Sequence, residues 1–142
     1  MSGPSKDLSD PEVSPSERYE RGLALKKAGL YKAAIDQFEM AAVDQPLAVK
    51  AHAQIGLCYK LSGCYDEAVT AFQKALKAPP ASPKETVQIL YVLGRTLESL
   101  GRVAETLEAY RWIRREDAVY RDVAERIERL SSRRPTVAAK KS

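Results

Sequence analysis

The feature that most constrains this chain is a residue pattern that recurs 34 positions further along. Eight pairs of positions match at this one offset: Gly22/Gly56, Leu25/Tyr59, Gly29/Gly63, Tyr31/Tyr65, Ala34/Ala68, Phe38/Phe72, Ala41/Ala75 and Pro46/Pro80. A third copy lies 38 positions beyond the second, and its four extra residues fall within the Pro-rich segment 79–83. An insertion is tolerated best in such a loop. We therefore expect three copies of one structural unit.

Each copy is predicted to be a helical hairpin, and the middle copy, residues 49–80, shows why. Gly63 suits the left-handed conformation that ends a first helix at a tight turn. Gly56 lies where the two helices cross, so a side chain there would push them apart. Ala68 and Ala75 lie seven residues apart on one face of the second helix and leave room for larger neighbours.

The two ends of the chain differ from the repeats. Residues 1–14 are rich in Ser, Pro and Asp and are expected to be disordered, after which Ser14, Pro15 and Glu17 form a helix start with a capping box. Residues 119–131 are expected to form an amphipathic helix that covers the last apolar surface, with Tyr120, Val123, Ala124, Ile127 and Leu130 on its apolar side and a mixed-charge outer face. Residues 132–142 form a basic tail, which we expect to be disordered and which accounts for the net charge of +4.

A 34-residue period with a helix–turn–helix in each copy resembles the tetratricopeptide repeat. The family pattern is carried in the middle copy by His52, Ile55-Gly56, Tyr59, Ala68, Phe72 and Pro80. The first copy carries it as Arg18, Arg21-Gly22, Leu25, Ala34, Phe38 and Pro46, and the third as Leu90, Leu93-Gly94, Leu97, Thr106 and Tyr110. The resemblance implies an all-α fold, a right-handed α-solenoid of seven helices: repeats over 15–118 (15–48, 49–82 and 87–118) and a capping helix over 119–131.

The sequence contains no pattern of residues typical of an enzyme site. His52 is the only histidine and occupies a bulky repeat position, and Cys58 and Cys64 form neither a Cys-x-x-Cys pair nor a metal-ligand set with it. No glycine-rich phosphate loop and no apolar run of membrane-spanning length is present. We therefore expect a cytoplasmic protein without catalytic activity, cofactor, metal or membrane insertion.

The resemblance implies that the first helices of the hairpins line a concave groove for a protein or peptide segment. The residues at groove positions are Tyr19, Leu23, Lys26, Lys50, Ala53, Gln54, Leu57, Lys60, Leu61, Gln88, Tyr91, Val92 and Arg95. Apolar residues with cations at the rim suit a segment with apolar anchors and some acidic character. Tyr19 and Tyr91 could equally pack against neighbouring helices.

Three functions remain open at this stage. The first is a scaffold or adaptor that binds a partner segment in the groove, and the second is a chaperone-like escort for secreted or assembly subunits. The third is nucleic-acid or acidic-surface binding through the basic tail, which four cations without interleaved aromatic residues support only weakly. The partner's identity and the oligomeric state do not follow from the sequence.

Overall fold

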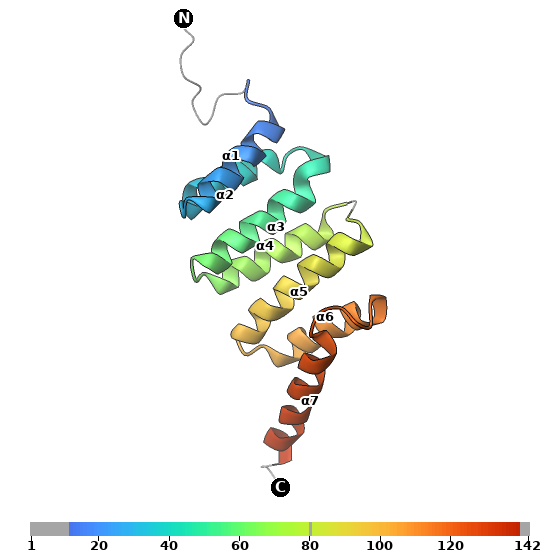
Figure 1. The fold of residues 1–142 in the computed structure, drawn as a ribbon. Coiled ribbons are helices and arrows are strands. Elements are labelled where there is room, and N and C mark those ends of the chain that lie inside the picture. The colour runs from blue at the N-terminus through green and yellow to red at the C-terminus, as the bar shows by residue number, and fades with distance from the viewer. Residues whose placement is uncertain (1–11, 80, 140–142) are drawn as a thin grey trace, which may run out of the picture. The chain divides into compact units, whose positions relative to one another are not determined.

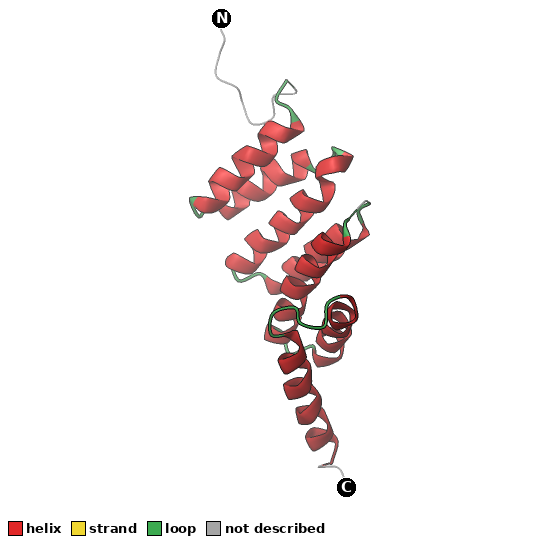
Figure 2. Cartoon of the chain, turned by 45° about the vertical axis from the view of Figure 1, so that its right-hand side comes forward, coloured by secondary structure: helices red, strands yellow, loops and turns green. Residues whose placement is uncertain are grey.

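The structure is a computed structural model that describes residues 12–79 and 81–139, with side chains described as far as Ser132. Its helices are α1 (Pro15–Lys27), α2 (Tyr31–Ala41), α3 (Gln45–Leu61), α4 (Tyr65–Lys77), α5 (Pro83–Ser99), α6 (Val103–Glu116) and α7 (Val123–Ala139) (Figure 1). No strand occurs in these ranges (Figure 2). The all-α prediction of three hairpins followed by a C-terminal helix is confirmed.

The close helix crossing predicted at Gly56 is present in the structure. A Cβ atom on Gly56 would lie only 2.5 Å from Cε1 of Phe72 in the partner helix, closer than real Cβ contacts allow. Gly22 stands in the same relation to Phe38, and Gly94 to Tyr110. Gly63 has the left-handed conformation expected for the turn, with a φ of +82°. The repeated glycines are thus explained by contacts within each hairpin.

The chain divides into two compact units between Ala81 and Ser82. Unit 1 contains helices α1–α4, and its core is formed mainly by small and branched side chains: Ala34, Ile35, Phe38, Ala41, Ala51, Ile55, Cys58 and Ala71. Cys58 is fully buried and free, and burial raises the pKa of its thiol to about 11. Its predicted role as a small core residue is confirmed.

Unit 2 contains helices α5–α7, and α7 completes its core. Val123, Ile127 and Leu130 of α7 are buried together with Val87, Leu107, Tyr110 and Ile113. These three positions confirm the predicted apolar face of the C-terminal helix. Ala124, which was expected on the same face, is exposed.

The helix boundaries differ from the predicted ones at several places. Helix α3 begins at Gln45 and α5 at Pro83, each four residues before the predicted repeat start, because Pro46 and Pro83 lie in the first helical turn, where proline is favoured. Ser82 and Glu85 also form a capping box that the sequence reading missed.

The termini differ from the prediction as well. Helix α7 begins at Val123 instead of 119 and continues to Ala139, so most of the segment expected to be a disordered tail is helical. At the N-terminus, the predicted capping box of Ser14 and Glu17 is present, and Val13 is buried although it was assigned to the disordered segment. The remainder of that segment, residues 1–11, and residues 140–142 lie outside the described residues. None of the described helices meets the length and apolarity that a bilayer crossing requires.

Candidate functional site

The residues predicted to line the groove all lie outside the buried core. Lys50, Leu61 and Gln88 are exposed, and the other ten are partly exposed. These positions are therefore accessible, although accessibility alone assigns no contact to any of them.

Helices α1 and α3 contact each other in unit 1, and a side-chain hydrogen bond joins them. Lys26 Nζ of α1 donates a hydrogen bond of 2.7 Å to Gln54 Oε1 of α3. Burial is the largest cause of a raised pKa at Tyr19, and a hydrogen bond with the Gln54 side chain opposes it. The structure thus brings Tyr19, Lys26 and Gln54 together from two repeats.

Apolar side chains lie on the same two helices. The Tyr19 and Phe38 rings pack edge to face with their centres 5.5 Å apart, and the partly buried Leu23 packs against the core of unit 1. Leu57 is partly exposed, and Leu61 keeps 58% of its surface exposed at the end of α3. We call this surface, formed by Tyr19, Leu23, Lys26, Lys50, Ala53, Gln54, Leu57, Lys60 and Leu61, the α1/α3 face.

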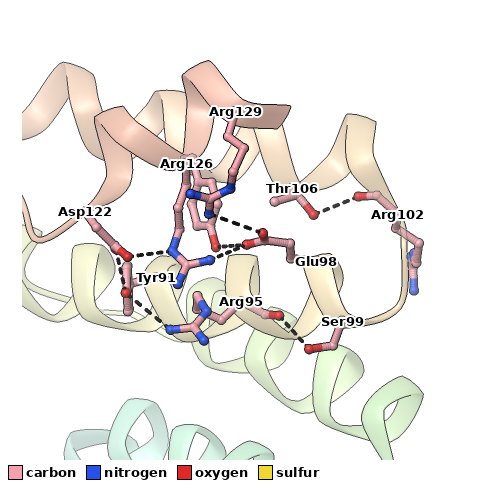
Figure 3. A network of polar contacts seen from close by, with 10 residues as sticks. Tyr91, Arg95, Glu98, Ser99, Arg102, Thr106, Asp122, Arg126 and Arg129 are labelled. Carbon is pink, nitrogen blue, oxygen red and sulfur yellow. Dashed lines mark hydrogen bonds and ion pairs between the residues drawn. The ribbon is translucent and has the colours of Figure 1, made fainter. Parts of the chain in front are cut away.

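In unit 2, side chains of α5 make polar contacts with Asp122, which directly precedes α7, and with Arg126 of α7. Tyr91 Oη donates to Asp122 Oδ1 at 2.8 Å, and Arg126 pairs with Asp122 at 2.8 Å and with Glu98 of α5 at 3.0 Å (Figure 3). Tyr110 Oη donates to the same Glu98 oxygen at 2.9 Å. This polar network joins α5, α6 and α7.

Two of the four predicted site residues of α5 therefore have partners within their own unit. Arg95 Nη1 donates to Tyr91 Oη at 3.4 Å, and the guanidinium of Arg121 lies 5.0 Å from the centre of the Tyr91 ring. Gln88 has no such polar contact among the described residues, and Val92 accepts a hydrogen bond of 2.8 Å from Thr96 Oγ1 only through its backbone carbonyl. Tyr91 and Arg95 are thus less available to a ligand than the repeat pattern suggested.

The sequence reading missed the inward role of Asp122 and Arg126, which it assigned to a solvated outer face. Burial tends to raise the pKa of Asp122, but hydrogen bonds from Tyr91 and Arg126 outweigh it, and the pKa is lowered overall. One signal could have revealed the network: Tyr110 replaces the phenylalanine of the other copies, and a buried hydroxyl needs a polar partner.

The described residues contain no group of three or more His, Cys, Asp or Glu side chains that could hold a metal ion. His52 is partly buried, and the pKa of its imidazole is lowered first by burial and then by the nearby Lys74, while Glu39 opposes the shift. Burial of this kind is typical of a structural histidine.

Repeated helical hairpins with a glycine–aromatic contact at each crossing define the chain as an α-helical repeat protein. A family model described as tetratricopeptide repeat matches residues 19–83 and 63–120, which together cover more than half of the chain. The protein belongs to the tetratricopeptide repeat family. A comparison with curated proteins returned no match.

Solved structures similar to this chain have the same fold. The crystal structure of MamA protein aligns with a TM-score of 0.71 at 16% identity over 83% of this chain, which spans only 62% of the MamA chain. The Yersinia enterocolitica type III secretion chaperone SycD, in complex with a peptide of the translocator YopD, aligns at 0.60 and 19% identity over 89% of this chain and 94% of its own. PcrH, in complex with the chaperone binding region of PopD, aligns at 0.59 and 16% identity over 89% and 92%.

Proposed function

We propose that this protein is a non-catalytic interaction module that binds a peptide segment of a partner protein on the α1/α3 face. The observation that carries the proposal is the Lys26–Gln54 hydrogen bond between α1 and α3, two helices that also carry partly exposed apolar side chains such as Leu57. Exposed apolar area supplies affinity, and a few placed polar groups fix the orientation of a bound segment. Reduced Cys58 and Cys64 support a cytoplasmic location.

The nature of the bound segment follows from the charges of this face. Three cationic residues, Lys26, Lys50 and Lys60, lie on the same two helices as the apolar residues Leu57 and Leu61. A segment with apolar anchors and neighbouring acidic residues complements this arrangement. In unit 2, Gln88 and Val92 of α5 stay predicted binding residues of that unit. Tyr91 contributes there only if its contacts with Asp122 and Arg121 are rearranged, and Arg95 only if it leaves Tyr91.

A chaperone-like escort of secreted or assembly subunits is the second candidate. It is favoured by the similarity to SycD and PcrH, both solved with segments of the proteins they bind, and by the match of this chain to almost the full length of each. We propose the α1/α3 face for both candidates, so they differ in the partner and not in the surface. Binding through the basic tail is the third and least supported candidate.

The proposal is tested by affinity capture with quantitative mass spectrometry, using wild type beside Leu57→Arg. A charged side chain at this position is expected to remove the bound partner at unchanged helicity, because it introduces a cation among the apolar contacts. Leu30→Arg is the matched control, since Leu30 is 56% exposed in the α1–α2 turn and is not one of the residues of the α1/α3 face. Retention of every partner by Leu57→Arg would contradict the proposal.

The tail hypothesis is separated from this one by salt and by truncation. Binding through arginines and lysines of the tail would weaken steeply as the salt concentration rises and would be lost in a chain that ends at Ser132. Binding on the α1/α3 face is expected to survive the same truncation, because that face lies in unit 1 and the truncated chain keeps Val123, Ile127 and Leu130 in the core of unit 2.

A further inference from the structure

Unit 1 contains a pocket that none of the predicted groove residues lines. Its volume is about 180 Å³, and its wall is built by three helices: Glu39 from α2, Ile55 and Tyr59 from α3, and Glu67, Ala71 and Lys74 from α4. The pocket is open to solvent and lies entirely within unit 1. It is therefore a surface separate from the α1/α3 face, and what it binds does not depend on the function proposed above.

The base of the pocket is apolar. Ile55 and Ala71 belong to the core of unit 1 and are only 4% and 5% exposed, and the Tyr59 side chain packs partly against the same core. The side chains of the base are held in place because they pack in this core. Such a base accommodates the methylene stem of a long side chain, whose apolar area gains from leaving water.

The Tyr59 end of the pocket is negatively charged. Glu39 and Glu67 come from different helices, and Asp36 precedes Glu39 by about one helical turn. Burial is the largest cause of the raised pKa of the Tyr59 hydroxyl, and the charges of Glu39, Glu67 and Asp36 raise it further. The electrostatic field of these carboxylates therefore acts on the Tyr59 side chain.

The two glutamates of the pocket wall and the nearby Asp36 outnumber Lys74, which lines the same pocket. Among the described residues, none of these three carboxylates forms a salt bridge. Carboxylates that act on the same site repel one another, and a bound guanidinium near Tyr59 would reduce that repulsion. The arrangement thus fits a positively charged ligand group with an apolar stem.

We propose that this pocket binds an arginine side chain of a partner protein, with its stem along Ile55 and Ala71 and its guanidinium over the Tyr59 ring between Glu39 and Glu67. Arginine fits better than lysine because its planar guanidinium stacks on an aromatic ring and offers paired donors to carboxylates. The charge of Lys74 acts on His52, where Glu39 opposes it, whereas Glu39 and Glu67 both act on Tyr59. We therefore expect the guanidinium on the Tyr59 side of the pocket.

The test is an NMR titration of the full chain with the peptide acetyl-Ala-Arg-Ala-amide and its citrulline counterpart. Citrulline has almost the shape of arginine but no charge. We expect saturable chemical-shift changes in residues 55–59 and 67–71 with the arginine peptide, at an affinity in the millimolar range for so small a ligand. The citrulline peptide should bind at least tenfold more weakly.

Variants of the acidic residues locate the site. The double variant Glu39→Gln/Glu67→Gln is expected to lose at least tenfold in affinity for the arginine peptide. The control Glu125→Gln/Glu128→Gln removes the same charge from exposed positions of α7 and should bind like wild type. Equal shifts with both peptides, an equal loss in the control variant, or no saturable shift in the wild type would each overturn the proposal. The peptide comparison needs only the wild type, so it decides the question even if a variant folds poorly.

Discussion

At the scale of single residues, the structure explains the repeated glycines by two different requirements, a close contact and a backbone conformation. Gly56 has no room for a Cβ because the Phe72 ring occupies that space, whereas Gly63 has open space but a left-handed backbone. A substitution at Gly56 therefore overpacks a helix crossing, and one at Gly63 strains a turn. Both glycines recur in the repeat pattern, but substitutions at the two positions are unfavourable for different physical reasons.

We predict that Gly56→Leu lowers the free energy of unfolding by about 1–3 kcal/mol, because the side chain must displace Phe72. Leucine forms helices better than glycine by up to about 1 kcal/mol, so any loss reports the packing clash and not helix propensity. Thermal unfolding monitored by circular dichroism measures the effect. Ala104→Leu is the control, since Ala104 is exposed on α6 and should change the melting temperature little. An unchanged melting temperature for Gly56→Leu would contradict the assigned crossing.

At the scale of elements, α7 is attached to unit 2 by an apolar face and by a polar network. Val123, Ile127 and Leu130 complete the core, and Arg126 links Asp122 to Glu98. Arg121, at the turn before the helix, has a positive φ of 42°, which is unusual for a residue with a side chain. Its guanidinium lies over the rings of Tyr91 and Tyr120, and these contacts stabilise the turn.

We predict that Arg126→Gln destabilises unit 2 by about 1–3 kcal/mol, because Glu98 and Asp122 both lose a charged hydrogen-bond donor in a partly buried place. Arg129→Gln is the matched control. Arg129 is 53% exposed and lies 4.0 Å from Glu98, so its removal should cost less than about 1 kcal/mol. Urea unfolding of both variants measures the difference. Equal effects of the two substitutions would show that the bridge adds nothing beyond general charge.

The lowered pKa of Asp122 predicts a pH dependence of stability. Hydrogen bonds from Tyr91 and Arg126 favour its ionised form in the folded chain despite burial, so the folded chain holds this proton less tightly than the unfolded chain. The resulting stability is present above the ordinary aspartate pKa of 3.8 and is lost as the pH falls through the lower folded value. Urea unfolding between about pH 5 and pH 3 should show the advantage of wild type over Asp122→Asn shrinking with falling pH. A constant difference would contradict this assignment.

The sequence predicts the hairpins well because their determinants are local and periodic. Gly56, Gly63, Ser14 and Glu17 act through contacts within one hairpin or one helix turn, so spacing alone reveals them. The network of Tyr91, Asp122 and Arg126 joins residues about thirty positions apart, and no spacing rule brings them together. The pocket around Tyr59 depends in the same way on three helices at once.

At the scale of the whole molecule, the central claim is that a partner segment lies on the α1/α3 face. Site-specific photo-crosslinking tests this claim most directly. A photoreactive amino acid is placed at position 57 or, as a control, at position 108, because Glu108 is exposed on α6, the second helix of the third hairpin. We predict that a photoreactive group at position 57 crosslinks to one defined segment of a captured partner and that the same group at position 108 does not. Crosslinking of that segment from position 108 with none from position 57 would contradict it.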